Sequence, residues 1–174
     1  MSETLVKLGD VRLSFPALFK KAVFENVETK YEATVLMEKD SKNHKMVDAA
    51  IKKFIANTFK DGAPKGLKIT CFQDGDEKEY DGYENMMALK GSSNKRIPVF
   101  DKDRSPITEE DQKIYAGCYV NAIFDFWYSS HPKGGKQILA NLLGVQFKRD
   151  GEAFSDAKVA GADDFDDESE DDFF

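Results

Sequence analysis

Aromatic and basic side chains occur together on segments that have the alternating pattern of β-strands. Tyr119 and Trp127 share one face of the segment 117–129, and Tyr31 directly follows Lys30. Aromatic rings stack on nucleic-acid bases at roughly 1–3 kcal/mol per base, while Lys and Arg side chains contact the phosphates. This combination of residues is therefore one that a single-stranded nucleic acid could use.

Two kinds of contact residue follow from this pattern. The candidate DNA-binding residues are Tyr31, Phe100, Tyr119 and Trp127 for base stacking, and Lys30, Lys90, Lys95, Arg96 and Arg104 for phosphate contacts. Each has a simpler interpretation, because most aromatic side chains lie in the core and most surface cations are solvated. The pattern alone leaves both interpretations open for each residue.

Residues that could support catalysis do not form a recognisable constellation. Neither His44 nor His131 belongs to a group with zinc-ligand spacing. The sequence GGK at 134–136 lacks the first glycine and the Ser/Thr of a phosphate-binding loop, and no Gly-x-Ser-x-Gly elbow occurs. We therefore expect no catalytic residue, no metal ion and no cofactor.

The segment 74–81 is acidic and raises two further alternatives. It lacks the ligand spacing of an EF-hand, so a solvated hairpin loop is the simpler interpretation. A nuclease could use carboxylates as metal ligands, and those available here are Asp74, Asp76, Glu77 and Asp81. They all belong to one loop with no partner strand, which makes the nuclease the weaker alternative.

Negative charge is concentrated at the C-terminus. The whole chain has a net charge of −7, and residues 163–174 hold eight of its 32 acids and no base, which leaves 24 acids against 25 Lys and Arg. Blocks of like charge repel each other, stay disordered and often bind partners. The predicted partner-binding tail comprises Asp163, Asp164, Asp166, Asp167, Glu168, Glu170, Asp171, Asp172, Phe173 and Phe174.

The last two residues of this tail are aromatic, which a tail that serves only solubility does not need. Phe173 and Phe174 could enter a pocket of a partner while the acids meet surrounding basic residues. An alternative function is that of an acidic DNA mimic or chaperone-like protein that binds basic proteins. That alternative predicts acids throughout the chain, whereas residues 1–162 carry about one positive charge.

Composition also bears on location and assembly. No run of about 18 apolar residues predicts a membrane span, and the start of the chain lacks the pattern of a signal peptide. Cys71 and Cys118 are expected to be free buried thiols in a cytoplasmic protein. An open sheet edge could pair two copies into a homodimer.

The elements that must position these residues are mostly strands. Apolar residues at Val47, Ile51, Ile55 and Phe59 predict a helix over 43–60. Gly144 could bend the last strand. The fold class is mainly β with one helix, in a small, partly open barrel. Strands are expected at 10–15, 30–39, 67–72, 85–90, 95–100, 117–129 and 137–148.

Four segments resemble a known family. They are KLGDVRLSFPALF at 7–19, KYEATVLMEK at 30–39, YAGCYVNAIFDFWY at 115–128 and LLGVQFKRDGEAF at 142–154. They are similar to phage single-stranded DNA-binding proteins of about this length, first catalogued as a domain of unknown function. The acidic tail resembles those of replication single-strand binders in bacteria and phages.

The resemblance implies a fold, a division of the chain and a function. It implies an OB-fold-like, five-stranded, partly open barrel at 1–152, a linker at 153–162 and a disordered acidic tail at 163–174. A helix between the second and third strands departs from the simplest OB-fold. The implied function is sequence-tolerant binding of single-stranded DNA in phage replication, recombination or repair, in the host cytoplasm. The tail would recruit replication or recombination proteins and compete with DNA.

Overall fold

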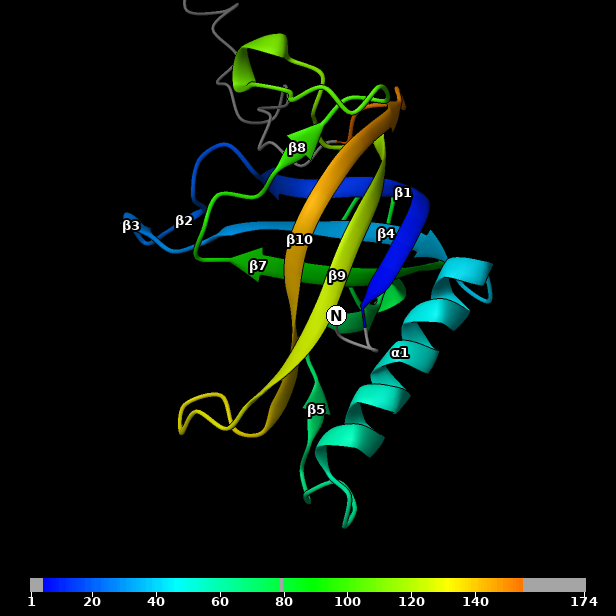
Figure 1. Cartoon of the computed structure of the whole chain (residues 1–174), viewed down its shortest axis with the longest axis vertical. Coiled ribbons are helices and arrows are strands. Elements are labelled where there is room, and N and C mark those ends of the chain that lie inside the picture. Colours follow the sequence, from blue (N-terminus) through cyan, green and yellow to red (C-terminus); the bar gives the residue numbers. More distant parts are fainter. Residues whose placement is uncertain (1–4, 79, 155–174) are drawn as a thin grey trace, which may run out of the picture.

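Five long strands form the body of the molecule (Figure 1). The computed structural model describes residues 5–78 and 80–154. The long strands are β1 (Val6–Ala17), β4 (Tyr31–Glu38), β7 (Met86–Ser93), β9 (Tyr119–Ser129) and β10 (Gln137–Arg149). Their spatial order is β1–β4–β7–β10–β9, with β9 again beside β1, so they close into a barrel. The predicted fold class, a mainly β barrel with one helix, is confirmed.

The seam that closes the barrel joins β7 to β10. These two strands run parallel and share one registered pair, Ser92 with Asn141, while the other neighbours in the barrel are antiparallel. Strands β9 and β10 follow the alternation predicted from the sequence, since Val120, Ala122 and Phe124 are buried and the residues between them face outward. A register shift beside Gly144 bends β10, as the glycine predicted.

Five shorter strands are present in addition to the five strands of the barrel. The predicted strand at 67–72 is divided in two, because its first part pairs with β10 and its second part with β7. Only the end of the predicted strand at 95–100 is extended, since Pro98 lacks the N–H that a ladder needs. The short strands are β2 (Val23–Phe24), β3 (Val27–Glu28), β5 (Lys68–Ile69), β6 (Phe72–Asp74) and β8 (Val99–Phe100).

Helix α1 (Lys42–Thr58) lies between β4 and β7 in the chain, as predicted. The Ser41 side chain caps it by accepting a hydrogen bond from the backbone N–H of His44 at 3.2 Å. Val47 and Ile51 are buried in the barrel core, so the four-residue spacing of apolar side chains attaches the helix to the barrel. In the part of the chain that the structure describes, no helix is long and apolar enough to cross a membrane.

Strand β1 is longer than predicted because two irregularities let it curve around the barrel. Its register with β9 shifts between Leu8 and Val11, and its register with β4 shifts between Ser14 and Ala17. Phe15 lies inside the second irregularity with a φ of +46°, in the left-handed region. The ring of Phe15 is thereby left partly exposed on the outside of the barrel.

Part of the outer face of β4 is covered. Leu36 is buried there by Tyr83 and Phe154. The Phe154 ring also lies 4.0 Å from the guanidinium carbon of Arg12. The folded body therefore extends at least two residues beyond the predicted boundary at residue 152. The predicted tail at 163–174 and most of the predicted linker lie outside the described residues.

The short helical turns η1 (Gly75–Glu77) and η2 (Glu109–Asp111) complete the described elements. η1 belongs to residues 74–78, which together with residues 80–85 lie on the outer face of β4 and β7. A Cβ atom at Gly75 would collide with the carbonyl oxygens of Tyr83 and Met86, so only glycine fits the close approach there.

Candidate nucleic-acid interface

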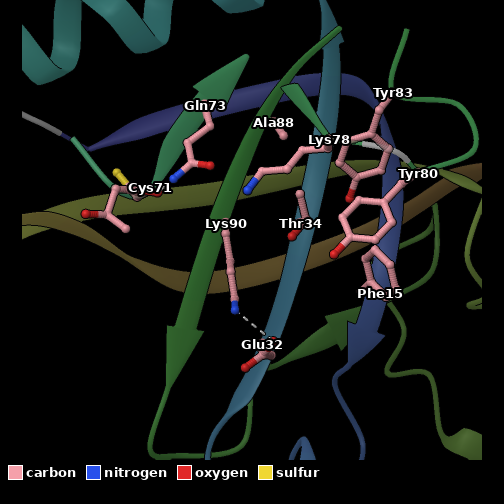
Figure 2. A pocket seen from close by; sticks show the side chains of 11 residues that line it. Phe15, Glu32, Thr34, Cys71, Gln73, Lys78, Tyr80, Tyr83, Ala88 and Lys90 are labelled. Atoms are coloured by element: carbon pink, nitrogen blue, oxygen red, sulfur yellow. Dashed lines mark hydrogen bonds and ion pairs between the residues drawn. The ribbon is translucent and has the colours of Figure 1, made fainter. Parts of the chain in front are cut away.

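A groove runs over the open part of the outer face of β4 and β7. It consists of two adjoining cavities, of about 390 and 410 Å³, that share Glu32, Thr70, Cys71 and Lys90 in their linings. We call this surface the sheet groove. Alternate residues of β4 and β7 point outward, and these side chains form the floor of the groove. Figure 2 shows the first of the two cavities.

Aromatic rings line one end of the sheet groove. Phe15 and Tyr80 meet edge to face with ring centroids 4.9 Å apart, and Tyr80 meets Tyr83 in the same way at 5.1 Å (Figure 2). Tyr83 is buried, and its hydroxyl donates a hydrogen bond to Ser14 Oγ at 2.8 Å. Phe15 and Tyr80 remain 37% and 48% exposed, so they present aromatic surface on a fixed support.

Trp127 lines the other end of the groove. It projects from β9 opposite Leu139 of β10 and is half-buried. The ammonium nitrogen of Lys30 lies 5.7 Å from the centroid of its ring, within the range of a cation–π contact. Lys30 and Trp127 therefore lie side by side, so that one nucleotide could place its phosphate at the lysine and its base on the ring.

Two more lysines lie between these aromatic ends. Lys90 Nζ forms an ion pair with Glu32 Oε2 at 3.3 Å across the floor (Figure 2). Lys78 is exposed and extends over β7 in the same view. A phosphate that binds Lys90 has to displace Glu32 or bind in its presence, so this ion pair opposes an anionic ligand.

The segment that carries Lys78, Tyr80 and Tyr83 is fastened by a charged clamp. Lys39 Nζ lies 2.8 Å from Asp74 Oδ1 and 2.6 Å from Asp76 Oδ2. Asp76 also accepts a hydrogen bond from the backbone N–H of Asn85 at 2.9 Å. The hydrogen bonds from Lys39 lower the pKa of both carboxyl groups, and those carboxylates raise the pKa of Lys39.

The clamp gives a structural role to two of the acids that were considered above as metal ligands of a nuclease, Asp74 and Asp76. Asp74 caps η1 by accepting a hydrogen bond from the backbone N–H of Asp76 at 2.9 Å, and both carboxylates bind Lys39. Within residues 5–78 and 80–154, no group of three or more His, Cys, Asp or Glu side chains is arranged to hold a metal ion.

Cys71 lies under the groove and is buried. Desolvation raises the pKa of its thiol to about 12, and burial also raises the pKa of Cys118. Both cysteines are free thiols, as predicted. Because the thiolate is the reactive form, neither side chain is suited to act as a nucleophile near neutral pH.

The sheet groove brings together three of the residues predicted from the sequence, Lys30, Lys90 and Trp127. Tyr31 has a different place. It packs half-buried against the core, on the face of β4 that carries Ala33. The alternation in the sequence already grouped these two residues, so it could have assigned Tyr31 to the core.

Tyr119 lies on β9 with its ring covered by arginines. The guanidinium carbon of Arg149 is 3.7 Å from the ring centroid, and that of Arg12 is 5.6 Å away. Asp10 binds Arg149 through oxygen–nitrogen distances of 3.0 and 3.2 Å. Hydrogen bonding from Arg149 lowers the pKa of Asp10.

The remaining predicted residues lie away from the sheet groove. Lys95 and Arg96 are exposed in the loop between β7 and β8, and Arg96 borders a cavity with Glu109. Phe100 and Arg104 line a separate groove of about 820 Å³ over β1, β9 and β10, which we call the rear groove. Among the described residues, the two grooves share no lining side chain.

Sequence reasoning missed Phe15, Lys78, Tyr80 and Tyr83. Phe15 lies in a strand whose alternation breaks only through a backbone irregularity. Lys78 and Tyr80 belong to the acidic segment 74–81, which was interpreted as a solvated loop, and Tyr83 lies two residues after it. The interleaving of Lys78, Tyr80 and Tyr83 within a short stretch was an available signal, since it repeats the combination sought elsewhere.

The strand order and the parallel β7–β10 pair define an OB-fold. In this class of protein, oligonucleotides and oligosaccharides bind on the face of the second and third barrel strands, which are β4 and β7 here. The chain belongs to the family of the single-stranded DNA-binding protein of Enterobacter phage Enc34, whose family model matches residues 4–174. The predicted family is therefore confirmed.

Individual relatives agree with this assignment. Protein p50 of Acyrthosiphon pisum secondary endosymbiont phage 1 is 37% identical over 172 residues, covering 93% of this chain and 92% of its own. The structure of the single-stranded DNA-binding protein from bacteriophage Enc34 in complex with ssDNA is similar, with a TM-score of 0.72 and 31% identity. That match covers 88% of this chain and 91% of that one.

A more distant structure shares the fold. It is gp2.5, a single-stranded DNA-binding protein encoded by bacteriophage T7, with a TM-score of 0.57 and 13% identity over 92% of this chain and all of that one. The Enc34 family is one of DNA binders rather than enzymes, so the prediction that the chain is not an enzyme is confirmed by its family.

Proposed function

We propose that the chain binds single-stranded DNA in the sheet groove. Bases stack on Phe15 and Tyr80 at one end and on Trp127 at the other, while Lys30, Lys78 and Lys90 contact phosphates. The observation that carries this proposal is the placement of partly exposed aromatic rings at both ends of a groove whose floor and rim hold lysines. The binding of ssDNA by the Enc34 relative, which is 31% identical, supports it.

The chemistry of the groove accounts for selectivity toward single strands. Stacking on side chains needs unpaired bases, because a duplex already stacks its bases on each other. Every base has a flat aromatic face, so stacking tolerates any sequence. We therefore infer sequence-tolerant binding, used in phage DNA replication, recombination or repair in the host cytoplasm.

Outside the sheet groove, Lys95, Arg96, Tyr119 and Tyr31 stay predicted DNA contacts, whereas we expect Phe100 and Arg104 in the rear groove to make no contact with the same DNA strand. Lys95 and Arg96 lie two and three residues after the end of β7. A bound DNA strand that continues past Ser92 would therefore reach them next. Tyr119 and Tyr31 are weaker candidates, since arginines cover one ring and the core surrounds the other. Homodimerisation through an open sheet edge likewise remains a hypothesis.

We also propose that the acidic tail competes with DNA for this groove and recruits replication or recombination proteins. Phe154, the last described residue, packs in the cluster of Tyr83, which lines the groove. The eight residues 155–162 can span at most about 28 Å. The acids of 163–174 can therefore approach the groove lysines while Phe173 and Phe174 take the place of bases.

Deleting residues 163–174 should then tighten binding of oligo-dT at low salt, by roughly threefold to tenfold, because an internal polyanion no longer competes. Fluorescence anisotropy of a labelled oligonucleotide measures this. The matched control replaces the eight acids by Asn and Gln and keeps the chain length. Equal affinities of the full-length and deleted proteins at low salt would contradict the competition.

The proposed function is tested by the fluorescence of Trp127, which is the single tryptophan of the chain. The protein is titrated at two salt concentrations with oligo-dT, oligo-dU, oligo-U and a matched duplex. These titrations distinguish the contribution of base stacking to affinity from that of phosphate contacts. We expect quenching by oligo-dT, weaker quenching by the duplex and loss of affinity at the higher salt. If labelled oligo-dT also shows no anisotropy change at low salt, single-strand binding is wrong and the acidic tail becomes the main functional element.

A further inference from the structure

The rear groove is an apolar surface with a basic rim. Its lining includes Phe100, Ile123 and Leu143, with Lys7 and Arg104 at its edge. Leu143 follows buried Leu142 in the alternation of β10, beside the register shift of that strand, and it is 39% exposed on the outside of the barrel. Apolar side chains exposed together in this way are typical of a binding surface.

The wall of this groove is held in place by hydrogen bonds. Gln146 Nε2 donates to the backbone carbonyls of Asp101 and Lys102 at 3.3 and 3.2 Å. The loop is closed by the Asp101 N–H, which donates to the Ser105 carbonyl at 2.8 Å, and by the Arg104 N–H, which donates to the Asp101 carbonyl at 2.9 Å. The groove is thus formed before any ligand arrives, which lowers the entropic cost of binding.

A second apolar surface lies on the hairpin of β2 and β3, which projects from the barrel (Figure 1). Val23, Phe24 and Val27 are 65%, 68% and 63% exposed there. Glu25 and Asn26 at the turn have φ values of 51° and 66°, the left-handed pair that a tight two-residue hairpin turn needs. Phe24 and Val27 pair across the hairpin and form its apolar face, whereas Val23 and Glu28 pair on the opposite face.

The base of the hairpin is also fixed. The Ala22 N–H donates to the Lys30 carbonyl at 2.8 Å, and the Thr29 N–H donates to the Ala22 carbonyl at 2.8 Å. Two exposed acids, Glu25 and Glu28, accompany the apolar side chains of the tip. These acids repel phosphates, which argues against the tip as a DNA contact.

We propose that the β2–β3 hairpin of one copy docks into the rear groove of the next copy. Phe24 and Val27 meet the apolar lining around Leu143, while Glu25 at the turn meets the basic rim. The two surfaces complement each other in both hydrophobicity and charge. Because the contact joins two different surfaces, it is heterologous and repeats in an open chain rather than closing a dimer.

The consequence for DNA follows from the placement of the surfaces. The rear groove and the sheet groove share no lining residue among those described, so docking leaves the sheet groove accessible. One hairpin tip buries a small area, which is typical of a weak contact in free solution. On a DNA strand, neighbouring copies are held together and the same contact produces cooperative binding. This last step rests on the proposed function, whereas the docking itself does not.

Cysteine cross-linking of the full-length chain without DNA tests the docking. The variants are Val27→Cys, Leu143→Cys and the double variant, oxidised with diamide. The native thiols of Cys71 and Cys118 are buried, so the unsubstituted protein should form no cross-linked species and serves as the control. We expect a mixture of the two single variants to give one disulfide-linked heterodimer. The double variant should give a ladder of dimers, trimers and longer chains.

Other cross-linking patterns would overturn the proposal. Efficient dimers of Val27→Cys with itself would show that two hairpins meet. A cross-link of Leu143→Cys to an added Phe174→Cys variant, in preference to Val27→Cys, would assign the rear groove to the acidic tail. Absence of any species beyond the unsubstituted background at high protein concentration would show that the groove does not receive the hairpin.

A charge exchange tests the contribution to DNA binding separately. Glu25→Lys and Lys7→Glu should each lower affinity for long poly-dT about tenfold and leave affinity for a single-site oligo-dT within about twofold. The double exchange in one chain should restore poly-dT binding, since every contact again pairs opposite charges. Loss of single-site binding in Glu25→Lys would instead make the hairpin a DNA contact and overturn the proposal. If the unsubstituted protein binds no oligo-dT, the proposed function fails while the cross-linking result stands.

Discussion

The sheet groove and the rear groove contain similar residue types but differ in what lies between them. Both combine exposed aromatic side chains with cations. In the sheet groove, hydroxyl, amide and carboxylate groups separate the rings, whereas the rear groove joins its aromatic residue to Ile123 and Leu143 in one apolar surface. A stacked base needs a ring on its face and solvent or cations at its edge, while a protein tip needs continuous apolar contact. Residue types alone therefore do not separate the two kinds of site.

The comparison predicts its largest effect for the aromatic residues. Trp127→Ala and Tyr80→Ala should each weaken single-site oligo-dT binding by about 10-fold to 100-fold, since stacking is worth roughly 1–3 kcal/mol per base. Fluorescence anisotropy of labelled oligo-dT measures both variants. Phe100→Ala in the rear groove is the matched control, with an expected change of less than about twofold. A similar loss for all three variants would show that the DNA path includes both grooves.

Removal of a cation should have the next largest effect. Lys90→Ala is expected to weaken oligo-dT binding about threefold to tenfold. It should also reduce the slope of log affinity against log salt by about 0.7, the value for one phosphate contact on a single strand. Lys7→Ala at the rear groove is the control and should leave single-site affinity and slope unchanged. An unchanged slope for Lys90→Ala would show that Glu32 keeps this lysine from the phosphates.

The ion pair on the groove floor predicts a gain rather than a loss. Glu32→Gln removes the carboxylate 3.3 Å from Lys90 and should tighten oligo-dT binding about threefold, because phosphate no longer competes with it. The salt titration used for Lys90→Ala measures this variant as well. Weaker binding by Glu32→Gln would indicate that the carboxylate positions Lys90 for the phosphate instead of opposing it.

The smallest effect concerns pH and the Lys39 clamp. The pKa values of Asp74 and Asp76 are lowered below their ordinary value of 3.8, so their ionised forms stabilise the folded state. This stabilisation is complete above the unfolded-state pKa and is lost as the pH falls through the lower folded-state values. Thermal unfolding of Asp76→Asn should show a lower midpoint than the unsubstituted chain at pH 7 and a smaller difference below pH 4. A difference that stays constant with pH would attribute the effect to packing alone.

Much of the framework could be predicted from the sequence because short-range patterns determine it. Alternation located β9 and β10, and the four-residue spacing located α1 with its ends within two residues. Within the candidate site, Lys30, Lys90 and Trp127 were found from residue type and strand face. Tyr80 was missed because its position depends on the Lys39 clamp, which joins segments 35 or more residues apart.

By itself, the sequence determined which residues face inward, where the helix lies, and that negative charge is concentrated at residues 163–174. These properties depend on side-chain periodicity and composition, which are local. Only the tertiary structure decided which outward residues share a surface. In a closed barrel, outward side chains of different strands point in different directions, so Trp127 and Phe100 belong to separate grooves. The irregularity that exposes Phe15 beside Tyr80 depends on how β1 curves against both of its neighbours, which no local pattern encodes.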